Sequence, residues 1–285
     1  MKPRTLSQIL CAGIAAMGLC SAEAHEIWLE QPEGENAILR FGEFAENLRE
    51  ASPGLLDNFV APTATLFAKG KTQALAFTKT ATGFGLPVRL ASGESLTAED
   101  ARLPIRASSR EGRPEDGTAP RQREGRTESG TPQQREGRAE SGTPRQREGR
   151  GGTRSWHRPA ARLITDFSAQ APSLALDIVP TGNPGVFQVT FHENPLPRTS
   201  VEISVQSGWS KRARTDDEGR VSFDLPWRGQ YVLSVSHADP APGERDGEKY
   251  DAIHYATTLT LVQPAGVAPF PAGPAAQPNP GRQAR

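Results

Sequence analysis

The stretch TDDEGRVSFDLPWRGQYVLSVSHADP, residues 215–240, decides the fold of this chain. It opens on a turn of acidic residues that ends in Gly219. Apolar side chains then alternate with polar ones in residues 221–225 and again in residues 231–237. Alternation with a period of two is the pattern of a half-buried strand. The stretch therefore predicts two consecutive strands, joined by a short connection.

The same alternation extends in both directions from this stretch. In the C-terminal part of the chain it predicts strands over 187–191, 201–205 and 252–262. In the N-terminal part it predicts strands over 26–30, 37–41, 64–67 and 75–79. We expect only one short helix, near residues 44–49. Many short strands separated by turn residues are typical of a sandwich. The predicted fold class is therefore all-β, built from immunoglobulin- or transthyretin-like β-sandwich units with a long disordered insertion.

The first 24 residues have the features of a secretory signal peptide. Lys2 and Arg4 precede an apolar core of 11 residues, and Ala22 and Ala24 form an A-x-A cleavage site. Cleavage after Ala24 makes His25 the first residue of the mature protein. Both cysteines lie before this point, so the mature chain has no disulfide and no thiolate ligand. These features predict a periplasmic protein.

The centre and the end of the chain differ in composition from the rest. The tetrapeptide REGR recurs at 110–113, 123–126, 135–138 and 147–150 in a polar repeat that has no large apolar residue. Such a repeat cannot bury enough surface to offset the entropy of ordering. We therefore divide the mature chain into an N-terminal β-rich part (25–105), a disordered linker (106–160), a C-terminal β-sandwich (161–263) and a disordered Pro/Ala-rich tail (264–285). The linker is compatible with an insertion within one structural unit.

The charge distribution indicates a cation as partner. Residues 25–105 and 159–263 together hold 16 Lys and Arg but 24 Asp and Glu, so the parts expected to fold are acidic. An acidic surface argues against nucleic acid as a partner. No apolar run in the mature chain reaches the length that spans a bilayer, so we expect no membrane span there.

Three segments carry a resemblance to a known family. The mature start HEIWLE (25–30), the long segment 215–251 and the ending AIHYATTLTL (252–261) together resemble the periplasmic proteins of the domain-of-unknown-function 4198 family. That family is often labelled a nickel- or cobalt-uptake component. The resemblance implies a role in metal uptake, with an inner- or outer-membrane metal transporter as a further partner.

Histidines are the candidate metal ligands. The α-amine and ring Nδ1 of an N-terminal His25 can bind one ion together, and an α-amine titrates near ~8, so a metal can displace its proton. His237 ends a predicted strand and His254 lies on the last one, so we predict both as further ligands. Asp251 is predicted to orient a ligating imidazole. His157 is expected to be solvated in the linker, and His192 to belong to a turn.

These features predict that the protein binds nickel, cobalt or copper for uptake or delivery. No nucleophile elbow, nucleotide loop or other catalytic motif is present, so we expect no enzymatic activity. One alternative is a structural or adhesion module that binds no metal. The other is a copper oxidase that uses an N-terminal histidine brace, although the chain lacks an evident cluster of surface aromatic residues for a flat substrate.

Overall fold

The computed structural model describes residues 25–59, 62–107 and 153–279. The predicted signal peptide and the REGR repeat lie outside the described residues. The described chain is almost entirely β-structure, which confirms the predicted fold class. Its only helical element is the 3-10 turn η1 (Leu55–Asn58), and no helix in these ranges is long and apolar enough to cross a membrane.

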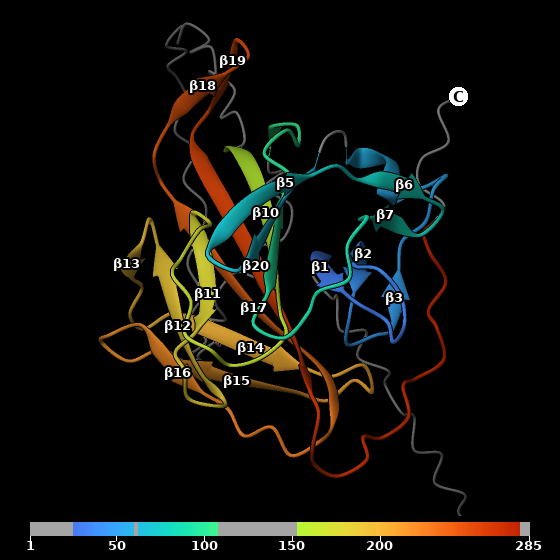
Figure 1. Ribbon diagram of the computed structural model, residues 1–285. Helices are drawn as coiled ribbons and strands as arrows, with labels where there is room; N and C mark the ends of the chain where they lie inside the picture. The colour runs from blue at the N-terminus through green and yellow to red at the C-terminus, as the bar shows by residue number, and fades with distance from the viewer. Residues whose placement is uncertain (1–24, 60–61, 108–152, 280–285) are drawn as a thin grey trace, which may run out of the picture.

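Three sheets and one hairpin make up the fold (Figure 1). Sheet A contains β1 (Glu26–Glu30), β2 (Ile38–Glu43), β3 (Leu48–Arg49), β6 (Thr78–Thr80) and β7 (Gly83–Gly85). Sheet B contains β4 (Thr63–Ala68), β5 (Lys71–Leu75), β8 (Ser95–Glu99), β9 (Arg106–Ala107), β10 (Arg154–Ile164), β14 (Ser200–Ser204), β15 (Ser210–Arg214), β17 (Gly229–Asp239) and β20 (Ala252–Gln263). Sheet C contains β11 (Leu176–Pro180), β12 (Val186–Phe191), β13 (Asn194–Pro195) and β16 (Arg220–Ser222). The hairpin is β18 (Gly243–Arg245) with β19 (Glu248–Tyr250).

Sheet B joins the two ends of the chain into one structural unit. Its strand order is β15-β14-β17-β20-β10-β8-β4-β5, so strands from before and after the repeat lie in the same sheet. Neighbours pair antiparallel except β10 and β20, which run parallel at its centre. The insertion therefore lies within one unit, as the sequence allowed.

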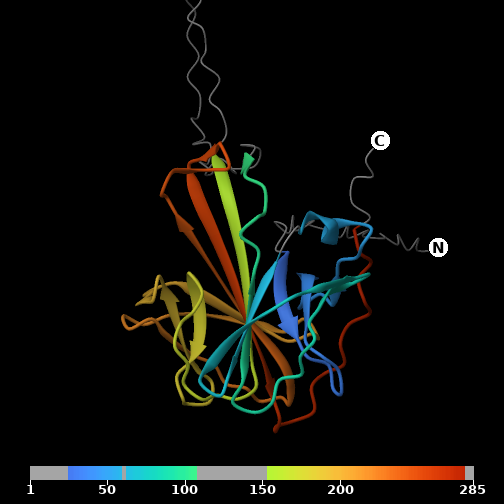
Figure 2. The same ribbon diagram turned by 45° about the horizontal axis from the view of Figure 1, so that its top comes forward.

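The two faces of sheet B are covered by different sheets. On β20 the adjacent residues Thr257 and Thr258 point to opposite faces. Thr257 Oγ1 donates a hydrogen bond to Leu176 O of sheet C, and Thr258 Oγ1 donates one to Ile27 O of sheet A. Figure 2 shows the long central strands with sheet C on one side and sheet A on the other. The fold is thus a three-layer arrangement in which β20 contacts both outer sheets.

Three sequence predictions need correction. Residues 44–47 form a turn, not a helix, because Asn47 takes a left-handed φ of 52° and the chain returns at once to pair β3 with β2. The predicted linker ends too late, because β10 begins at Arg154. Pro159 within this strand has no backbone donor, and a proline in a central strand argues against strand assignment from sequence.

The C-terminal tail is the third correction, because residues 264–279 are held against the rest of the protein. The tail forms single bridges from Val267 to Trp227 and from Ala276 to Leu48. In Figure 1 it leaves the base of β20 and runs up beside β3. Its composition suggested disorder because it has few apolar side chains, but its contacts are made mainly by backbone groups.

Candidate metal centre

His25 lies immediately before β1, and both nitrogens of its ring face carboxylates. Nε2 lies 2.7 Å from Oε1 of Glu50, and Nδ1 lies 3.4 Å from Oε1 of Glu43. The ring packs on Phe41, with the ring centres 5.2 Å apart. The His25 side chain is 16% exposed and that of Glu50 is fully buried. The ring is therefore fixed in place by a buried partner on one side and open to a second group on the other.

The contact with Glu50 decides which ring nitrogen can bind a metal ion. A carboxylate accepts hydrogen bonds, so Nε2 carries the proton that is donated to Glu50. In a neutral imidazole the other nitrogen, Nδ1, then keeps its lone pair. Nδ1 is also the nitrogen that can close a chelate ring with the residue's own α-amine. Orientation of a ligating imidazole by a carboxylate is the usual arrangement at metal sites.

Glu50 is itself held by the C-terminal tail. Its second oxygen, Oε2, accepts a hydrogen bond of 2.9 Å from the backbone N–H of Asn279. Nearby, the Asn47 side-chain amide donates to Gly273 O at 2.8 Å. The tail thus supplies one of the groups that compensate a fully buried carboxylate, and residues more than 220 positions apart in the sequence meet at the candidate site.

Further carboxylates lie close to His25. Burial, together with the negative charges of Glu202 and Glu43, raises the pKa of the Glu26 carboxyl to about 8, although a hydrogen bond from the Phe44 backbone acts in the opposite direction. Glu202 is paired with Arg212. A carboxyl group whose pKa is raised by burial and by neighbouring negative charge is stabilised in its ionised form by an added positive charge. The surroundings of His25 therefore favour a cation.

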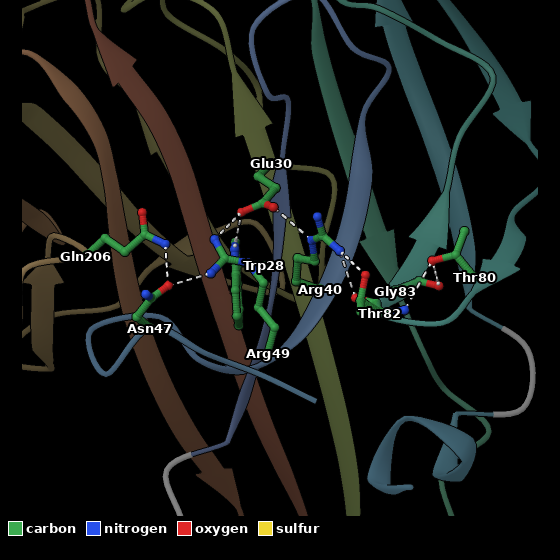
Figure 3. A network of polar contacts seen from close by, with 9 residues as sticks. All are labelled: Trp28, Glu30, Arg40, Asn47, Arg49, Thr80, Thr82, Gly83 and Gln206. Carbon is green, nitrogen blue, oxygen red and sulfur yellow. Dashed lines mark hydrogen bonds and ion pairs between the residues drawn. The ribbon is translucent and has the colours of Figure 1, made fainter. Parts of the chain in front are cut away.

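A second polar network lies beside this site on the other face of sheet A (Figure 3). Glu30 accepts hydrogen bonds from Arg40 Nε at 2.7 Å, from Arg49 Nη2 at 3.1 Å and from the Trp28 indole at 3.1 Å. The two guanidiniums lower the pKa of Glu30 in spite of its burial, which acts to raise it. The negative charge of Glu30 is compensated by the two arginines, so we assign this network a structural role. It joins β1 to β2 and β3.

The structure separates the three predicted histidine ligands. His237 pairs with Tyr255 across β17 and β20, and its ring packs on Phe191 of sheet C, with ring centres 4.4 Å apart. His254 precedes Tyr255 and therefore points to the opposite face of sheet B. One ion cannot contact both rings. Metal binding by His237 and metal binding by His254 therefore remain two separate predictions, each for a different ion.

The remaining predicted site residues have other contacts. Asp251 Oδ2 accepts a hydrogen bond of 2.7 Å from the backbone N–H of Arg154, so it fixes the start of β10 against β20. His192 lies in the turn after β12 with a φ of 48°, as expected. His157 is exposed, but it lies on β10 and not in a linker. Among the described residues, no group of three or more His, Asp or Glu side chains is spaced to hold a metal ion.

Sequence reasoning missed Glu43 and Glu50. Both lie in a polar segment without periodicity, and their role depends on the turn at 44–47 that brings β3 and the following residue back to His25. Neither their residue type nor their spacing in the sequence indicates that they lie beside His25. Only the pairing of β2 with β3 shows that these two carboxylates flank one ring.

Comparison with known proteins gives one match. The model of the family described as Domain of unknown function (DUF4198) matches residues 163–239, from the end of β10 to the end of β17. This segment includes sheet C and excludes His25 and its carboxylates. No curated protein and no solved structure matches the chain. Residues 163–239 are therefore similar to the DUF4198 family, whose description assigns no function.

Proposed function

We propose that the mature protein, exported to the periplasm and beginning at His25, binds one transition-metal ion for uptake or delivery to a membrane transporter. The α-amine and Nδ1 of His25 are the first two ligands. The Glu43 carboxylate, which lies 3.4 Å from Nδ1, is the third. Such a site needs only two side chains because the main chain supplies the remaining ligand, so it differs from a cluster of three side chains.

The hydrogen bond between His25 and Glu50 carries this proposal. It leaves Nδ1 as the nitrogen with the lone pair and holds the ring so that Nδ1 faces Glu43. Without a metal ion, a protonated ring can donate to both carboxylates, and an ion bound at Nδ1 would replace one of these two protons. The arrangement of a buried carboxylate on Nε2 and a less buried one near Nδ1 supports a ligand and an orienting group with separate roles.

Charge and donor type indicate the class of ion. Two nitrogen donors favour nickel, copper and cobalt over calcium or magnesium. At pH 7 the Glu26 carboxyl, with a pKa of about 8, is mostly protonated, and a nearby divalent ion would favour its carboxylate form. Among these metals, affinity alone would rank copper above nickel and nickel above cobalt, so supply and geometry would select the ion in the cell.

The test is a calorimetric titration of Ni²⁺, Co²⁺ and Cu²⁺ into the mature protein, with its first residue confirmed by mass spectrometry. We expect one tight site that is lost when a single residue is added before His25, since the extension removes the α-amine from the chelate. Affinity should also fall below neutral pH, because the amine must lose its proton to bind.

Two substitutions separate ligand from orienting group. Glu43→Gln removes a proposed ligand, and Glu50→Gln removes the acceptor on Nε2. We expect each to lower affinity by about 10–100-fold, the effect typical of lost groups around a metal. Arg198→Ala, in the exposed Arg198–Asp217 pair, is the control and should leave affinity within about twofold. Binding that tolerates the extension before His25 would overturn the proposal.

A further inference from the structure

Two histidines lie near the starts of β10 and β20, the two parallel strands at the centre of sheet B. His157 of β10 and His254 of β20 are direct partners in the register, so their side chains leave the same face of sheet B. Their rings are stacked, with centres 5.3 Å apart and planes inclined by 20°. Both residues are exposed. Figures 1 and 2 show β10 and β20 side by side in the centre of the fold.

The pair is separate from the His25 site. β1 contacts β20 at Thr258, which lies four residues from His254, or roughly 13 Å along an extended strand. Both ring nitrogens of His25 already face Glu43 and Glu50. An ion at the His157–His254 pair therefore uses a different set of ligands from an ion at His25.

The ring nitrogens of both histidines are available to bind a metal ion. In the described part of the chain, the ring stack is the contact that the two histidines make, and no protein hydrogen bond engages their nitrogens. Burial, His254 and Arg106 lower the pKa of His157, in that order of importance. A neutral imidazole is the form that coordinates a metal. The nearby Arg106 disfavours hard cations, which bind mainly through charge.

We propose that His157 and His254 form a two-imidazole surface site for a late-transition-metal dication, with water in the remaining positions. Each Zn–N, Ni–N or Cu–N bond is about 2.0–2.1 Å, so two adjacent ligand nitrogens lie roughly 3 Å apart. Exposed rings whose centres are 5.3 Å apart reach this separation by rotation about their side-chain bonds. The strands need not move.

Register explains why the pair can act as a chelate. The two backbones are hydrogen-bonded neighbours, so the second imidazole is held next to the ion as soon as the first has bound. An intramolecular second ligand acts at a high effective concentration. Binding should therefore be tighter than that of two independent surface histidines, and it should depend on both rings together.

The experiment uses Cu²⁺ as the probe, in full mature protein that carries one extra residue before His25. The extension removes the proposed α-amine chelate, so this test does not depend on the outcome at that site. His157→Ala, His254→Ala and the double variant are titrated by calorimetry, and the nitrogen couplings of bound Cu²⁺ are counted by electron paramagnetic resonance. His192→Ala, which removes one exposed imidazole from the turn after β12, is the matched control.

We expect either single variant to lower Cu²⁺ affinity by about tenfold or more, with little further loss in the double variant. The spectrum should change from two coordinated imidazole nitrogens to one, and His192→Ala should change neither readout. Single losses of about twofold or less, or full additivity in the double variant, would show two independent imidazoles and overturn the proposal. Because His157, His192 and His254 are all exposed, the substitutions should keep the fold, and thermal melting of each apo variant checks this.

Discussion

The face of sheet B that packs on sheet C buries one continuous apolar cluster and one ion pair, Arg162–Asp177, whereas the face that packs on sheet A buries two apolar clusters beside carboxylates. The first cluster runs from Ile164 to Leu261 and includes Tyr231 and Phe187, both fully buried. The second face holds two separate clusters, one of which contains only Trp28, Phe44 and Val232. Beside them lie the buried carboxylates of Glu30 and Glu50.

From this difference we expect sheet C and the face of sheet B that it covers (the sheet C half) to contribute most of the stability, and sheet A with the opposite face (the sheet A half) to hold the proposed metal site. The sheet C half agrees with the family match and has one internal ion pair, Arg162–Asp177, which is almost completely buried. The sheet A half has an incompletely apolar interior, a candidate metal ligand and a tail that crosses over to it. A region that must keep charged groups near the surface cannot close its core in the same way.

The largest effect should come from the sheet C half. Asp177→Ala leaves the Arg162 guanidinium buried without its partner and also removes the acceptor for the backbone N–H groups of Ser173 and Leu174. We expect a loss of about 3–5 kcal/mol in the free energy of unfolding, measured by urea titration. The control is Asp217→Ala in the exposed Arg198–Asp217 pair, which should cost less than about 1 kcal/mol. Similar losses for the two variants would contradict the assignment.

The corresponding change in the sheet A half should be smaller. Glu30→Gln removes the charge that compensates Arg40 and Arg49, whose side chains are 15% and 25% exposed and so keep some contact with water. We expect a loss of about 2 kcal/mol at pH 7, also measured by urea titration. The pKa of Glu30 is lowered in the fold, so this contribution is present above the ordinary value of 4.5 and disappears as the pH falls below it. A loss that persisted unchanged at pH 3 would contradict a charge-based role.

Removing the tail tests whether it belongs to the sheet A half. A chain that ends at Gln263 loses the hydrogen bonds from Asn279 to Glu50 and from Asn47 to Gly273. We expect the free energy of unfolding to fall by about 1–2 kcal/mol, since a typical buried hydrogen bond contributes about 1 kcal/mol. A chain that ends at Asn279 keeps these contacts and should match the full-length protein. Equal stability of both shortened chains would show that the tail contributes nothing.

The smallest effect should come from Glu26 and should depend on pH. Its pKa is raised to about 8 in the fold, so the stability it allows at pH 4.5 is lost as the pH rises from 4.5 to 8. Glu26→Gln removes this loss. After allowance for screening of a half-buried group, we expect the variant to be about 1 kcal/mol more stable than the parent at pH 8.5 and equal to it at pH 4. A variant that was less stable at both pH values would contradict the direction of the pKa shift.

Sequence patterns predicted well the strands of sheet C and the sheet B strands that pack on it, because apolar and polar residues alternate regularly in them. The alternation in residues 187–191, 201–205 and 231–237 corresponds to β12, β14 and β17, and the last predicted strand corresponds to β20. Period-two alternation is a local property of strands with one buried face, so it can be read from the sequence. The sequence did not predict β10, because the Arg, His and Pro residues in this central strand interrupt its apolar pattern.

The sequence by itself determined the all-β class, most strand positions and the candidate role of His25 as a chelating first residue. Only the tertiary structure decided which groups face that residue. Glu43 and Glu50 reach His25 through the pairing of β2 with β3, Asn279 reaches Glu50 through the tail, and His157 meets His254 through the register of β10 with β20. Each of these contacts joins positions that are distant along the chain. Periodicity indicates which face of a sheet a residue occupies, but it does not identify which distant strands pair, and that choice depends on side-chain packing and turn geometry in the whole fold.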